Sequence, residues 1–166
     1  MSNSGYILDD RLLASVGIRF LNYILDTIFV VAIFMGLCLF AGVLIGLFEL
    51  TGLSQWMNEL GDWGWNMVIF TIYFFYFLIT EGLFGRSLAK FITGTVVVDE
   101  YGEKPDFGMI VRRSLCRFIP FDVFSYFGTR GWHDSISDTY VVNKKALAEE
   151  IKTFHEFNLI GNNEVI

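Results

Sequence analysis

The chain has 166 residues, of which 54% are hydrophobic, 17% aromatic and only 18% charged. A soluble domain of this size would carry more charge, so the composition favours an integral membrane protein. The net charge of −6 argues against nucleic acid as a partner, because a nucleic-acid-binding surface needs an excess of positive charge.

The first apolar stretch carries no charge from Thr27 to Phe48. A transmembrane helix needs about 20 apolar residues, so we expect a first span over about 19–48. Asp9 and Asp10 precede this stretch and no cleavage site follows a short apolar run, which indicates a retained span rather than a signal peptide. Such a helix is about 45 Å long against a hydrocarbon core of about 30 Å, so its start extends past the membrane boundary.

Arg19 and Asp26 lie two helical turns apart at the start of this span, with Asn22 and Tyr23 between them on nearly the same face. An ionisable residue in a membrane helix is costly, which makes Asp26 a candidate functional residue and Arg19 its candidate ion-pair partner. Two interpretations stay open. Asp26 either holds neighbouring helices together or binds and releases a cation or proton.

A second stretch without charge, Asn66–Thr80, predicts a second span over about 66–84. Glu81 then lies at the depth of Asp26, with Arg86 just below it. We therefore expect Glu81 and Arg86 to support a polar cluster around Asp26, together with Asn22 and Tyr23.

The connector between the spans contains acidic residues but no Lys or Arg, whereas the outer flanks of both spans are basic. The positive-inside rule therefore places the N-terminus in the cytoplasm and the connector outside. An apolar stripe at helical spacing predicts a short amphipathic helix in the connector, lying at the outer interface. The residues of this stripe are Leu53, Trp56, Met57 and Leu60.

Two short valine-rich segments, 93–99 and 138–143, are prone to form strands and could pair beneath the membrane. Between them, residues 108–127 are apolar but carry Arg112, Arg113 and Arg117. This pattern fits an interfacial or re-entrant amphipathic helix with its arginines toward lipid phosphates. A third span, kinked at Pro120, is the alternative.

The C-terminal segment has one apolar edge over residues 146–157, which predicts a cytosolic amphipathic helix docked on the body or on a partner. Its lysines favour a cytoplasmic C-terminus and thus an even number of crossings. We divide the chain into a membrane domain, 1–145, and a C-terminal helix or tail, 146–166. The expected fold class is an α-helical membrane protein with two transmembrane helices, an interfacial amphipathic helix and a small cytosolic β element.

Enzyme chemistry finds little support in the sequence, and we predict neither catalytic residues, nor a metal site, nor a cofactor. His133 and Asp134 are adjacent, but no zinc-binding or nucleophile motif accompanies them. Cys38 falls in a span and Cys116 in a basic helix, which argues against a disulfide between them.

Five short motifs, in order along residues 11–143, resemble the RDD family of membrane proteins, which is named for one arginine and two aspartates. They are Arg19 to Asp26, Gly85-Arg-Ser-Leu-Ala-Lys90 followed by Gly94 and the valine run, Gly102, Arg112-Arg113, and His133-Asp134 followed by Thr139-Tyr-Val-Val142. The resemblance implies that Arg19, Asp26 and Asp134 are the three name-giving residues. Ala89 stands where the family has glycine, which weakens any expectation of close backbone approach there.

The resemblance also implies transport of unidentified ligands, with cation/proton antiport in some members. Two spans leave little protein to enclose a water-filled path. We therefore expect a non-catalytic subunit or scaffold in an oligomer or larger membrane complex, whose partners are lipid and other subunits. The alternative is a homo-oligomeric cation/proton antiporter. We expect the bacterial inner membrane as its location, with both termini cytoplasmic.

Overall fold

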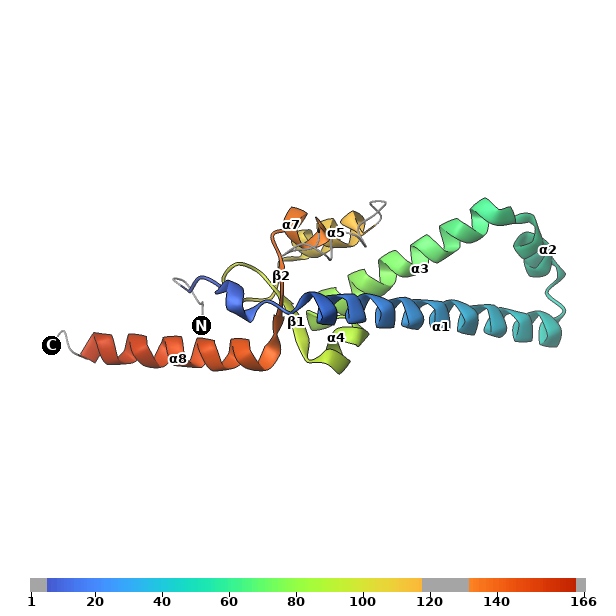
Figure 1. Cartoon of the computed structure of the whole chain (residues 1–166). Helices are drawn as coiled ribbons and strands as arrows, with labels where there is room; N and C mark the ends of the chain where they lie inside the picture. Colours follow the sequence, from blue (N-terminus) through green and yellow to red (C-terminus); the bar gives the residue numbers. More distant parts are fainter. Residues whose placement is uncertain (1–5, 118–131, 164–166) are drawn as a thin grey trace.

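The computed structural model describes residues 6–117 and 132–163. Figure 1 shows an elongated, mostly helical molecule in which two long helices extend toward one end and α8 (Lys144–Asn163) toward the other. The long helices are α1 (Val16–Phe48) and α3 (Gly61–Phe84), and both are long and apolar enough to cross a membrane. The structure thus confirms a helical protein with two candidate membrane-spanning helices.

Both long helices begin earlier than predicted. α1 starts at Val16 because the Ser15 hydroxyl accepts a hydrogen bond from the N–H of Ile18, at 3.4 Å, and so caps the first turn. The connector is almost entirely helical: α2 (Thr51–Glu59) is the predicted short helix, and α3 follows it directly from Gly61. In Figure 1 the two long helices diverge toward α2, which joins their far ends.

Two glycines shape the chain after the second long helix. α3 ends at Gly85, whose φ of 67° lies in the left-handed region and whose N–H donates to the carbonyl of Glu81 at 2.9 Å. The short helix α4 (Leu88–Thr93) ends in the same way at Gly94, with a φ of 69°. Glycine adopts this conformation without steric cost, so the chain folds back beneath α3 and enters the sheet.

The sheet consists of β1 (Thr95–Val98) and β2 (Tyr140–Asn143), which run antiparallel with Thr95 opposite Asn143. The predicted pairing of the two valine-rich segments is therefore confirmed. A single bridge between Leu13 and Val142 adds the chain before α1 to the other edge of β2. This bridge ties the start of the first long helix to the sheet.

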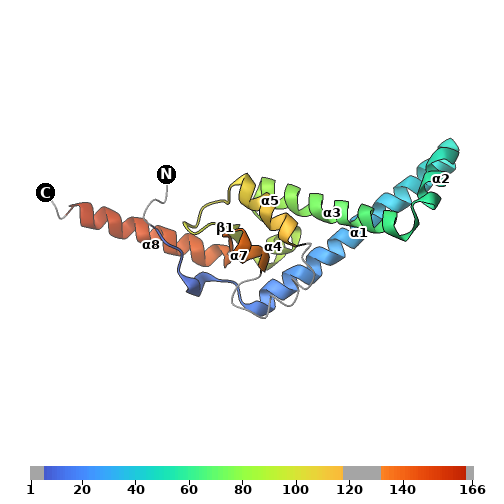
Figure 2. The ribbon, with the colours of Figure 1, turned by 90° about the horizontal axis from the view of Figure 1, so that it is seen from above.

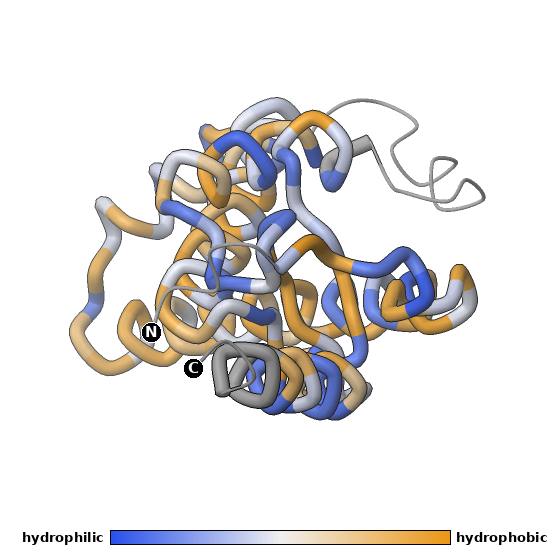
Figure 3. Tube along the Cα trace, turned by 90° about the vertical axis from the view of Figure 1, so that its left-hand side faces the viewer, coloured by the Kyte–Doolittle hydropathy of each residue, from blue (hydrophilic) through white to orange (hydrophobic). Residues whose placement is uncertain are grey.

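An apolar core surrounds the sheet at the end opposite α2. Its buried residues are Tyr6, Leu12, Val98, Val142 and Leu147. α8 contributes Leu147 and packs Ile151 and Phe154 against this core, so it contacts the body, which is one of the two arrangements expected for the C-terminal helix. Viewed from this end, Figure 3 shows hydrophilic residues interspersed with hydrophobic ones.

Helix α5 (Phe107–Cys116) lies against the C-terminal part of α3 and against α7 (Trp132–Ile136), as Figure 2 also shows. Asp106 caps α5 by accepting a hydrogen bond from the N–H of Gly108 at 3.1 Å. The rest of the helix predicted over 108–127, including Pro120, lies outside the described residues, apart from Arg117. The prediction of a kinked third span falls on that segment.

Candidate functional site

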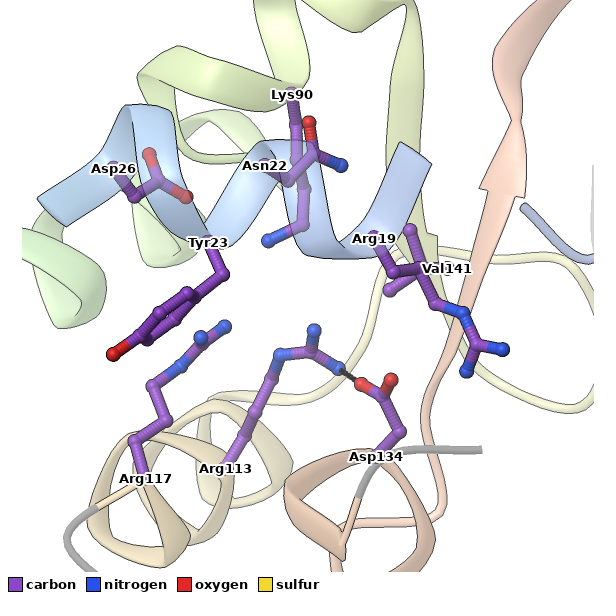
Figure 4. A pocket seen from close by; sticks show the side chains of 9 residues that line it. All are labelled: Arg19, Asn22, Tyr23, Asp26, Lys90, Arg113, Arg117, Asp134 and Val141. Atoms are coloured by element: carbon purple, nitrogen blue, oxygen red, sulfur yellow. Dashed lines mark hydrogen bonds and ion pairs between the residues drawn. The ribbon is translucent and has the colours of Figure 1, made fainter. Parts of the chain in front are cut away.

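A group of buried ionisable and polar side chains lies where α1, α3, α4, α5 and α7 meet, and we call it the polar cluster (Figure 4). Its members are Arg19, Asn22, Asp26, Glu81, Ser87, Lys90, Arg113, Arg117 and Asp134. Three of them, Arg19, Asp26 and Asp134, are far apart in the sequence but line one small cavity. The sequence therefore identified three residues that the fold brings together.

Asp26 is held by three hydrogen bonds from two other segments of the chain. The hydroxyls of Tyr76 and Ser87 each donate to its carboxylate at 2.6 Å, and the backbone N–H of Ala89 donates at 3.1 Å. Tyr76 belongs to α3, whereas Ser87 and Ala89 belong to the start of α4. Hydrogen bonds to an ionised acceptor are stronger than neutral ones, so Asp26 fastens both segments to α1.

Asn22, one turn before Asp26, connects α1 to the beginning of the sheet. Its amide N–H donates to the Thr95 hydroxyl at 3.1 Å, and its carbonyl oxygen accepts from the Thr93 hydroxyl at 2.6 Å. Asn22 is 4% exposed, so these bonds satisfy an otherwise costly buried amide. The same face of α1 therefore contacts α4, β1 and, through Asp26, α3.

Glu81 is a second buried carboxylate, and three cations surround it. Lys90 contacts its Oε1 at 2.7 Å and Arg117 contacts the same oxygen at 2.9 Å, while Arg113 lies 3.0 Å from its Oε2. Burial lowers the pKa of the Lys90 ammonium, whereas the Glu81 carboxylate acts in the opposite direction. Glu81 thus joins α3 to both α4 and α5.

Arg113 connects Glu81 to Asp134, the third buried carboxylate. Its Nη1 donates to the Asp134 carboxylate and to the Thr139 hydroxyl, the latter at 2.6 Å. The Arg113 side chain is fully buried, so the prediction that it contacts lipid phosphates is wrong. A buried guanidinium needs carboxylate partners, and two carboxylates from different helices supply them.

Arg117 also points inward rather than toward lipid. Its guanidinium lies 3.8 Å from the centroid of the Phe77 ring and pairs with Glu81, and its side chain is 4% exposed. The lipid-phosphate prediction is therefore wrong for Arg117 as well. Among the three arginines, Arg112 alone has an exposed position on α5, and its contact with lipid stays a prediction.

Two other predicted partners, Arg19 and Arg86, are not among the described contacts of the Asp26 carboxylate. In Figure 4 the guanidinium of Arg19 is directed away from the Asp26 carboxylate, and no ion pair joins the two among the described contacts; Arg19 has an interaction of its own. Arg86 lies over the ring of Phe91, 3.8 Å from its centroid, and does not join the described polar cluster. Tyr23 lines the cavity beside Asp26, as predicted.

Sequence reasoning missed the residues that hold Asp26. Ser87 and Ala89 fall inside the Gly85–Lys90 motif, but a motif does not reveal which of its atoms faces a residue 61 or 63 positions away. Alanine in place of the family's glycine at position 89 weakened the expectation of close backbone approach there. Ala89 is fully buried and its N–H reaches Asp26, so this position accommodates a methyl group.

The cluster encloses a cavity of about 10 Å³. No group of three or more His, Cys, Asp or Glu residues that could hold a metal ion occurs in the described part of the chain. The arrangement is a network of buried ion pairs and hydrogen bonds between helices. The carboxylates of Asp26, Glu81 and Asp134 each receive donors from other elements.

The comparisons with known proteins agree with the resemblance seen in the motifs. No curated protein and no solved structure matches the chain. The model of the RDD family matches residues 13–157, which include Arg19, Asp26 and Asp134. Because this match covers most of the sequence, the chain belongs to the RDD family.

Proposed function

We propose that this protein is a non-catalytic subunit or scaffold of an oligomer or larger complex in the bacterial inner membrane, with both termini in the cytoplasm. The proposal rests on one observation, which is that the apolar side chains along most of the two long helices are not buried within the chain. Within the described chain, no residue of α1 beyond Val30 is buried, and none of α3 before Tyr76. These apolar faces must be covered by lipid or by a partner.

The chemistry of the polar cluster supports the same proposal. The carboxylates of Asp26 and Glu81 receive donors from three helices, so these groups already serve as links between elements. The walls of the cavity carry four cations, Arg19, Lys90, Arg113 and Arg117, and two carboxylates, Asp26 and Asp134, so a further cation entering it would meet net repulsion. This environment favours a structural role over cation/proton antiport.

The proposal is tested by extracting the full chain from its native membrane in lipid nanodiscs and measuring its mass by native mass spectrometry. We expect an oligomer or a stable complex with another membrane protein. A monomer without any partner would contradict the proposal.

Bulky substitutions then locate the contact. A Cβ added at Gly36, Gly42 or Gly46 of α1 meets no atom within 4 Å, so the monomer should tolerate leucine at each position. We expect at least one of the three variants to lose association, because small residues let membrane helices approach closely. Phe40→Leu, at an exposed position of the same helix, is the matched control.

Proteoliposomes test the antiporter alternative. If the purified chain exchanges sodium for protons and Asp26→Asn abolishes that flux in a folded protein, the scaffold proposal fails. We expect no flux from either protein.

A further inference from the structure

The cavity in the polar cluster is small and its walls are rich in hydrogen-bond donors. It measures about 10 Å³ and lies between α1, α4, α5 and α7. In Figure 4, the Lys90 side chain points toward Arg113 and Arg117, which extend from the C-terminal end of α5 on the opposite side of the same space. A cavity of this volume admits one water molecule or one single-atom ion.

Arg113 presents to this region a donor that nothing in the described chain accepts. Its Nη2 is buried and has no hydrogen-bond partner among the described residues, although its Nη1 and Nε face Asp134 and Glu81. Leaving a buried charged donor unsatisfied is costly. Arginine can only donate, so any guest that satisfies Nη2 must be an acceptor.

Lys90 faces the same cavity from α4. Its ammonium carries three N–H groups, and the acceptor it has among the described residues is Glu81. Three cations already share the Glu81 carboxylate: Lys90 and Arg117 contact its Oε1, and Arg113 Nε lies 3.0 Å from its Oε2. The cavity lining carries the cations Arg19, Lys90, Arg113 and Arg117 against the carboxylates Asp26 and Asp134. This excess of positive charge favours an anion over a water molecule.

We propose that the cavity binds a single monatomic anion, chloride, between the Lys90 ammonium and the Nη2 of Arg113. The volume excludes phosphate, sulfate and carboxylates. The bound chloride joins α4 to α5 at the centre of the polar cluster and thereby stabilises the folded chain.

Thermal unfolding of the full chain in nanodiscs tests this site. The protein is prepared in sodium gluconate, and gluconate is replaced by chloride at constant ionic strength. We expect the unfolding midpoint to rise saturably by about 3 °C, with the same response to bromide and none to sulfate. Identical midpoints in chloride and gluconate would mean that only water fills the cavity, and the proposal would be overturned.

A charge-conserving variant tests whether the stabilisation by chloride arises at this cavity. Arg113→Lys keeps the positive charge but removes Nη2, so we expect it to lose the chloride response. Arg112→Lys changes the exposed neighbour on α5 and should retain the response. An unchanged response in folded Arg113→Lys would assign the anion to another site and overturn the proposal.

Direct observation on the unaltered protein keeps the test valid if Arg113→Lys does not fold. Crystals grown in bromide should show one anomalous peak within hydrogen-bond distance of Lys90 Nζ and Arg113 Nη2. Density at that position without an anomalous signal is water and refutes the site.

Discussion

The two long helices differ between their two ends, near α2 and near the sheet, in the kinds of residue that they expose and bury. Toward α2, the helices expose large apolar side chains such as Leu39, which is 70% exposed, and diverge from each other (Figure 1). Toward the sheet, they bury Asp26 and Glu81 at 2% and 1% exposure. Within these two helices, the part that is free of charge is thus the more exposed, and the buried residues lie toward the end that carries Asp26 and Glu81.

This difference follows from the solvent around a membrane protein. Lipid is as apolar as leucine, so apolar faces gain little by packing on each other within the bilayer. Ion pairs and hydrogen bonds, by contrast, have no substitute in an apolar interior and fix one geometry. We therefore expect polar side chains to determine the internal structure and apolar ones to remain available to lipid or partners.

The largest effect is expected where a buried charge loses its partner. Arg113→Ala leaves Glu81 and Asp134 without their shared cation and should destabilise the chain by about 3–5 kcal/mol. Arg112→Ala, at the exposed neighbouring position, should have little effect. Thermal unfolding in mild detergent measures both variants. Equal losses of stability would contradict the idea that buried charges hold the chain together and exposed ones do not.

A smaller loss is expected when Asp26 keeps its shape but loses its charge. Asp26→Asn weakens the bonds from Tyr76, Ser87 and Ala89, and we expect a cost of about 2–3 kcal/mol. Asp62→Asn, an exposed change in the first turn of α3, is the control. A stable Asp26→Asn variant would show that the carboxylate is not needed to hold the helices.

Removing a single hydroxyl should cost less again. Tyr76→Phe deletes the hydroxyl that donates to Asp26 at 2.6 Å and accepts from the N–H of Leu88 at 3.3 Å, and we expect a loss of about 1 kcal/mol. Tyr101→Phe removes a hydroxyl from a side chain that is 44% exposed and serves as reference. If Tyr76→Phe is added to Asp26→Asn, the second change should cost less than Tyr76→Phe alone, because the bond that the two groups share is already weakened, whereas the bond from Leu88 is lost in both cases.

The smallest effect is expected in the outer part of the first helix. Leu39→Ala should change the stability of the monomer in detergent by less than about 0.5 kcal/mol. Val30→Ala, at a buried position on the same helix, should cost more than about 1 kcal/mol because it leaves a cavity against Tyr76 and Phe77. Similar losses at both positions would mean that the outer part also packs within the chain.

Much of the fold could be predicted because the long helices and the strands follow from local patterns in the sequence. The absence of charge over 27–48 and 66–80, together with the valine runs on either side of α5, indicated two long helices and a paired sheet. The resemblance of the motifs to the RDD family also pointed to Arg19, Asp26 and Asp134, which line one cavity in the folded chain.

The direction of the arginines on α5 could not be predicted in the same way. An amphipathic helix with Arg112, Arg113 and Arg117 fits lipid phosphates as well as it fits buried carboxylates. The choice depends on Glu81 and Asp134, which lie 32 and 21 positions from Arg113 and approach it only after α3, α5 and α7 have packed.

The sequence by itself determined that this is a membrane protein with two apolar helices, because hydrophobicity and helical length are local properties. Only the tertiary structure decided that Asp26 is bound by Tyr76, Ser87 and the N–H of Ala89 rather than by Arg19 on its own helix. The physical reason is that a buried charge takes whichever donors the packed chain brings to it.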